Sequence, residues 1–181
     1  PATEHRLAVH IKSGQTIQLD EWVHALESQA NDLKEFPTQE RYYAHRHWWR
    51  DFWNRGYVIP SGTAVADTIA TGYILQRYIS GCSTRGKLPP KFNGSLFTVA
   101  TREPSSDTVY NADYRRWGGP YWFQNTRLIY WPMLEAGDFE MMQALFKFYM
   151  EALPFAKARV RKYFGHAGAM FPETMYFWGS Y

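Results

Sequence analysis

Apolar residues recur every three or four positions over long stretches of this chain, and this spacing constrains the fold more than any other feature. Such spacing puts the apolar side chains on one face of an α-helix. It predicts helices over about residues 20–34, 38–54 and 63–82. The 63–82 stretch is apolar on most sides, which is typical of a helix buried between others. The sequence therefore predicts an all-α fold of antiparallel helical hairpins.

Two further helices are predicted after Pro120. The first should end near Glu135, and the second should begin at a Gly137-Asp138 cap and run to Tyr163. The apolar face of this second helix is made of residues at steps of three or four: Met142, Leu145, Tyr149, Leu153, Ala156 and Val160.

The N-terminal segment follows a different pattern. Over residues 5–19 the side chains alternate in a strand-like way. The apolar members of this alternation are Leu7, Val9 and Ile11. We interpret residues 1–19 as a short β-strand and linker left from a preceding β domain, and residues 20–181 as part of a helical domain.

The composition is that of a soluble globular protein. The 181 residues suffice for one ordinary domain, with 45% hydrophobic and 20% charged residues. The net charge of +3 comes from Lys and Arg spread along the chain, so nucleic-acid binding is not favoured. No run approaches the length of a membrane-spanning helix, so no membrane association is expected. The single cysteine, Cys82, excludes an internal disulfide framework and a thiolate-rich metal site.

Aromatic residues make up 18% of the chain and are densest in residues 110–132, YNADYRRWGGPYWFQNTRLIYWP. Aromatic faces stack on the C–H face of a sugar ring or on a base, while the interspersed Arg, Asp, Asn and Gln can hydrogen-bond hydroxyls. We predict a binding surface here. Its candidate ligand contacts are Asp113, Arg116, Trp117 and Tyr121. The alternative is a junction between helices whose polar groups satisfy only the backbone.

Three segments carry a family resemblance. Residues 77–94, RYISGCSTRGKLPPKFNG, contain an Arg-Tyr pair, small polar residues, Leu-Pro and a closing Gly. Residues 121–132, YWFQNTRLIYWP, end in Tyr-Trp-Pro and carry Asn125, and residues 165–179, GHAGAMFPETMYFWG, start at a Gly and end near a Trp. These patterns resemble the six-hairpin glycosidases, specifically the helical domain of glycoside hydrolase family 95 and related uncharacterised bacterial proteins.

The resemblance implies an (α/α)6 toroid, of which this chain would hold about the first half. It also implies a glycoside hydrolase that cleaves a glycosidic bond of an oligo- or polysaccharide with inversion, in an extracellular or periplasmic location. The remainder of a larger polypeptide would complete the ring and supply the family's general acid. The fragment is therefore expected to be inactive alone.

Two residues are candidate catalytic groups. The resemblance places Asn125 on a family asparagine that helps to position the attacking water. Glu173 follows Pro172 at a predicted helix start, and its apolar neighbours would favour a general acid. The alternative role of this carboxylate is to stabilise the helix dipole. Trp178 is a candidate stacking residue, and Asn93 is a further candidate for substrate binding.

Other functions remain open at this stage. A polysaccharide lyase on a similar toroid would use Arg and Asn to neutralise a uronate carboxylate and Tyr or His to remove a proton. A non-catalytic glycan-binding fragment is the third possibility. No cofactor and no metal are expected, because His45 and His47 would point about 200° apart on a helix.

Overall fold

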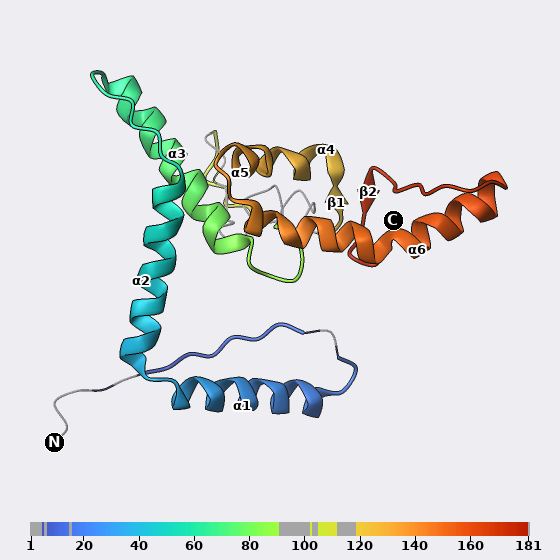
Figure 1. Cartoon of the computed structure of the whole chain (residues 1–181), viewed down its shortest axis with the longest axis horizontal. Coiled ribbons are helices and arrows are strands. Elements are labelled where there is room, and N and C mark those ends of the chain that lie inside the picture. The colour runs from blue at the N-terminus through green and yellow to red at the C-terminus, as the bar shows by residue number, and fades with distance from the viewer. Residues whose placement is uncertain are drawn as a thin grey trace. The chain divides into compact units, whose positions relative to one another are not determined.

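The computed structural model describes residues 5, 7–14, 16–90, 102, 105–111 and 119–180. Most of these residues are helical, which confirms the predicted mainly-α class (Figure 1). The chain divides into two compact units, Pro1–Asp51 and Phe52–Tyr181.

The first unit contains helix α1 (Leu19–Glu35) and most of helix α2 (Thr38–Arg55), close to the predicted bounds. The segment before α1 runs back beside that helix (Figure 1), where the Trp22 indole N–H donates to the Lys12 carbonyl at 3.2 Å. No strand occurs among the described residues before Leu19, so the predicted strand over 5–19 is not formed there. A strand requires a partner for its backbone N–H and C=O groups, and alternation alone does not supply one.

In the second unit, helix α3 (Ala64–Ser83) begins at Thr63, whose hydroxyl accepts a hydrogen bond from the Ala66 N–H at 3.2 Å. The burial of α3 differs from the prediction. Its apolar side chains are largely exposed, as Val65 and Ile69 show, while Arg77 is only 5% exposed. The apolar residues of the 63–82 stretch therefore did not indicate which side of this helix is packed.

Arg77 joins the end of α2 to the rest of this unit. Its guanidinium donates to the Phe52 carbonyl at 2.7 Å and to the Gly56 carbonyl. Carbonyls in the last turn of a helix have no partner within the helix, so Arg77 caps the C-terminal end of α2. The guanidinium carbon also lies 4.2 Å from the centroid of the Phe52 ring, a cation–π contact.

Asp138 is the counter-ion of this buried arginine. Its carboxylate lies 3.3 Å from the Arg77 guanidinium and 3.0 Å from Arg55 Nε, and the residue is 1% exposed. Gly137 has a φ of 70°, a left-handed conformation that a glycine adopts without strain. Asp138 occupies the predicted N-cap position, at the start of the 3-10 helix that leads into α6, but its side chain makes no capping bond and binds the two arginines instead.

The single helix predicted between Pro120 and Glu135 is divided into four elements. They are strand β1 (Tyr121–Trp122), helix α4 (Phe123–Thr126), the 3-10 helix η1 (Arg127–Ile129) and helix α5 (Trp131–Glu135). Strand β1 pairs antiparallel with β2 (Thr174–Met175), which takes its first residues out of the helix. Pro132 has no N–H and lies in the first turn of α5, a position suited to the start of a new helix.

After the 3-10 helix η2 (Phe139–Met142), the unit continues with its longest helix, α6 (Gln143–Phe164). The predicted apolar face is largely correct, since Leu145, Ala156 and Val160 are buried. Helix α6 continues through Pro154 and ends at Gly165, which has a φ of 72°. The helix start predicted at Pro172 is wrong, because this segment leads into β2.

We expect Asp138→Ala to lower the free energy of unfolding by about 3–5 kcal/mol, because it leaves the Arg77 guanidinium buried without a counter-ion. Glu140→Ala is the matched control: this carboxylate pairs with Arg55 at 3.0 Å but its side chain is 55% exposed, so the loss should be at most about 1 kcal/mol. Denaturant unfolding followed by tryptophan fluorescence measures both. Equal losses in the two variants would contradict the role given to Asp138.

Candidate functional site

Tyr121 lies where the three segments with family resemblance meet. Its hydroxyl donates to the Pro89 carbonyl at 3.0 Å, and its backbone is paired with Met175. Its ring packs against Phe148 with the two centroids 4.9 Å apart. Tyr121, Phe148 and Met175 form a buried apolar cluster. Contacts between residues far apart in sequence therefore bring the three segments together.

The surroundings of Tyr121 are those of a core residue. The side chain is 5% exposed, and burial raises the pKa of its phenol to about 12. A stacking contact with a sugar needs an exposed ring face. The structure gives Tyr121 a place in the core instead of the exposed face that its predicted role requires.

Glu173 holds the start of α4 in place. Its Oε1 accepts a hydrogen bond from the Gln124 N–H at 3.0 Å, and its backbone carbonyl accepts one from the Phe123 N–H at 2.8 Å. The first N–H groups of a helix have no partner within the helix, and Glu173 supplies two of the acceptors for α4. The carboxylate thus serves the first turn of a helix other than the one predicted to begin at Pro172.

A cleft of about 380 Å³ lies beside this carboxylate. Its lining consists of three aromatic rings, one proline and one acid: Phe123, Tyr149, Phe171, Pro172 and Glu173. The Tyr149 ring meets Phe123 edge to face with centroids 5.8 Å apart, and meets Phe171 in the same way at 5.1 Å. Edge-to-face contacts fix the relative orientation of the rings, so these walls are mutually supported.

The phenol of Tyr149 is the second polar group of this cleft. Burial raises its pKa, and the nearby negative charge of Glu173 raises it further. Tyr149 therefore stays protonated near neutral pH, where its hydroxyl can both donate and accept a hydrogen bond. The cleft offers apolar ring surface, one carboxylate and one neutral hydroxyl.

Trp178 forms a separate aromatic surface. Its indole stacks on the Tyr176 ring with centroids 4.5 Å apart and planes 1° from parallel. The side chain is 55% exposed, as a stacking platform requires, but Trp178 does not line the cleft beside Glu173. Residues 176–180 are closed by a bond from the Tyr176 N–H to the Ser180 carbonyl at 2.8 Å.

Asn125 is half-buried on α4, next to the residue whose N–H binds Glu173. It is thus close to the carboxylate along the chain, although the cleft lining does not include it. The remaining predicted contacts lie outside the described residues. These are Asn93, Asp113, Arg116 and Trp117.

Sequence reasoning missed two of the rings that line the cleft. The helical spacing predicts Tyr149 on the apolar face of its helix, and Phe123 lies in the 121–132 segment that carries the resemblance, but neither is among the predicted ligand contacts. A hydroxyl-bearing ring within an otherwise aliphatic stripe is the signal that could have singled out Tyr149. Phe171, two positions before Glu173, is one of the apolar neighbours on which the prediction for that carboxylate rests.

Within the described ranges, no group of three or more His, Cys, Asp and Glu side chains is placed to hold a metal ion. None of the helices in these same ranges combines the length and the apolar character needed to cross a bilayer.

Comparison with known proteins gives one match. A family model described as a domain of unknown function (DUF5703) matches residues 1–58, less than half of the chain. The matched region covers the first compact unit and extends just beyond the end of α2. No curated protein and no solved structure matches the chain.

The titration of Tyr121 gives a testable pH dependence. Its folded pKa of about 12 lies above the value of about 10 for an unfolded tyrosine, so its contribution to stability is complete below about pH 10 and is lost as the pH rises toward 12. We expect the free energy of unfolding to fall less steeply across this range in Tyr121→Phe than in the unchanged chain. Urea unfolding at a series of alkaline pH values measures the two slopes, and identical slopes would refute the expectation.

Proposed function

We propose that this chain is part of a carbohydrate-active protein, a glycoside hydrolase of the (α/α)6 class, and that it contributes a sugar-binding cleft. The observation that carries the proposal is the lining of the cleft by Phe123, Tyr149, Phe171, Pro172 and Glu173. Ligand sites typically combine apolar and aromatic walls with a few directed polar groups. This arrangement fits a sugar, whose C–H faces are apolar and whose edges carry hydroxyls.

Each part of the cleft has a distinct task in this proposal. The rings of Phe123 and Phe171 contact the C–H face of a sugar. The phenol of Tyr149 and the carboxylate of Glu173 bind sugar hydroxyls. The hydrogen bond to the charged carboxylate is stronger than the one to the neutral phenol. Oε1 of Glu173 is held by the Gln124 N–H, and Oε2 makes no hydrogen bond with any described residue, so it can bind the ligand.

The proposed reaction is hydrolysis with inversion, which needs two carboxyl groups about 6.5–9.5 Å apart with a water between them. In this proposal Glu173 acts as the base that accepts a proton from the water, and Asn125 orients that water. This role replaces the general acid that its apolar neighbours suggest from the sequence, because the resemblance places the acid in the remainder of the polypeptide. Glu173 is the only carboxylate among the described residues that line the cleft. The acid would come from another hairpin of the toroid, so this chain alone should bind sugar without turnover.

The N-terminal segment supports the proposal that a β domain precedes the helical hairpins. Leu7, Val9 and Ile11 are between 74% and 92% exposed, although they alternate as in a half-buried strand. These residues form no strand in this chain, and we propose that they do so when a preceding β domain supplies the partner strand. The helical hairpins that follow would then begin the toroid.

We expect Phe171→Ala to weaken the binding of a neutral oligosaccharide by about threefold to tenfold, because an aromatic contact contributes about 0.5–1.5 kcal/mol. Tyr57→Ala is the matched control, since Tyr57 is 69% exposed and does not line the cleft. A panel of glycans screened by calorimetry would identify the ligand. Equal affinity in the two variants would remove the cleft from the proposal.

Glu173→Gln separates binding from catalysis. The amide oxygen of a glutamine can still accept the Gln124 N–H, so the fold should be kept, but the amide cannot take up a proton from water. In a polypeptide that contains the complete ring, we expect sugar binding to persist and hydrolysis to fall by at least about a hundredfold. Undiminished hydrolysis would exclude Glu173 as the base.

A further inference from the structure

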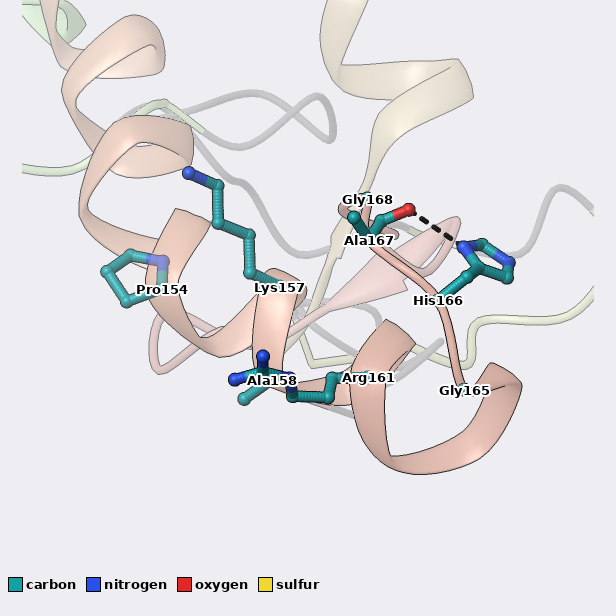
Figure 2. Close-up of a pocket in the computed structure, with 8 residues that line it drawn as sticks. All are labelled: Pro154, Lys157, Ala158, Arg161, Gly165, His166, Ala167 and Gly168. Carbon is teal, nitrogen blue, oxygen red and sulfur yellow. Dashed lines mark hydrogen bonds between the residues drawn. The ribbon is translucent and has the colours of Figure 1, made fainter.

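A second hollow lies at the C-terminal end of α6 (Figure 2), and none of the residues that line it lines the aromatic cleft. Its volume is about 660 Å³. One side is the α6 face that carries Pro154, Lys157, Ala158 and Arg161, and the other side is the loop from Gly165 to Gly168. These four residues follow the spacing i, i+3, i+4 and i+7, so they share one face of the helix.

Glycines shape the loop side of this hollow. Gly165 and Gly168 have φ values of 72° and 146°, which other residues rarely adopt, and they return the chain along α6. Ala158 and Ala167 are small as well. These small residues leave the space between α6 and the loop open.

The charge of this region is uniformly positive. Residues 152–172 contain four of the chain's 20 Lys and Arg residues and none of its 17 Asp and Glu residues. Lys157 and Arg161 lie one helical turn apart on the hollow's α6 face, and like charges at this spacing destabilise a helix by a few tenths of a kcal/mol. No carboxylate of the described part of the chain lines the hollow to offset that repulsion.

Three of these four basic residues, Lys157, Arg159 and Arg161, differ in their partners. Arg159 has a structural role, since it donates to the Met170 carbonyl at 3.2 Å and to the Gly179 carbonyl at 3.1 Å. Lys157 and Arg161 make no hydrogen bond or ion pair with any described residue. The helix dipole favours a cation in the last turn, which accounts for Arg161 but not for Lys157, seven residues before the end of α6.

We propose that Lys157 and Arg161 bind an anionic substituent, a carboxylate or a sulfate ester, of an acidic polysaccharide. This inference rests on the proposed function and narrows its substrate class. A guanidinium binds two oxygens of such a group in parallel, and an ammonium adds a compact positive charge. His166 has no part in the contact, because its Nδ1 lies 2.8 Å from the Ala167 carbonyl and its ring points away from both side chains in Figure 2.

The test compares three probes on the 181-residue chain: polygalacturonate, dextran sulfate and neutral dextran. We expect Lys157→Gln/Arg161→Gln to lower the affinity for an acidic probe by about fivefold to tenfold, and to reduce the salt dependence of that affinity. The matched control is Lys87→Gln/Lys147→Gln, which removes the same two charges from exposed positions outside the hollow. Calorimetry at several salt concentrations measures all of these values, and melting temperatures verify folding.

Each result decides the proposal. A loss confined to Lys157→Gln/Arg161→Gln supports it, while equal losses in the two double variants would show a general effect of net charge and overturn it. Competition by inorganic phosphate that matches the polymer's affinity would reduce the hollow to a site for small anions, and would also overturn it. If neutral glycans bind at the cleft and acidic ones bind no better, only this inference fails. If no glycan of any kind binds, the proposed function fails as well.

Discussion

The buried ion pair between Arg77 and Asp138 is the interaction on which the second unit depends. It links the last carbonyls of α2 and the interior of α3 to the turn that leads into α6. A buried guanidinium is costly unless its charge is paired and its N–H groups are bonded, and here both conditions are met. Because the partners come from three separate parts of the chain, the pair favours one arrangement of the helices over looser alternatives.

The short β1–β2 ladder is the second constraint. It contains only two residue pairs, yet it fixes the start of α4 against the segment that follows α6. Glu173 completes this link by accepting the Phe123 and Gln124 N–H groups. The aromatic cleft results from this link, because its walls come from α4, from α6 and from the residues just before β2. A small ladder can thus bring together residues that are about 50 positions apart in sequence. It is stable because the backbone N–H and C=O groups that it takes out of water are hydrogen-bonded to one another.

Helix α6 carries residues of both the aromatic cleft and the second hollow, the one lined by Lys157 and Arg161. Tyr149 lines the cleft, and Lys157 and Arg161 follow eight and twelve positions later on the same helix. A rise of about 1.5 Å per residue puts them about 12 Å and 18 Å further along the axis, on neighbouring faces of the helix. An extended polymer can cover such distances, whereas a single sugar cannot. Under the proposed function, the two sites together would suit a chain-like ligand, bound at one end by the rings and at the other by the positive charges.

The sequence by itself determined the helices, because the 3.6-residue period is a local property that each stretch carries alone. The bounds of α1, α2 and α3 were predicted to within about two residues, and the apolar face of α6 was largely correct. Only the tertiary structure decided that Arg77 is buried, that the helix expected after Pro120 is broken, and that Glu173 faces an aromatic cleft. These features depend on partners far away in the chain. Periodicity does not specify which distant carbonyl, carboxylate or strand will meet a given side chain, so they emerge only when the helices pack.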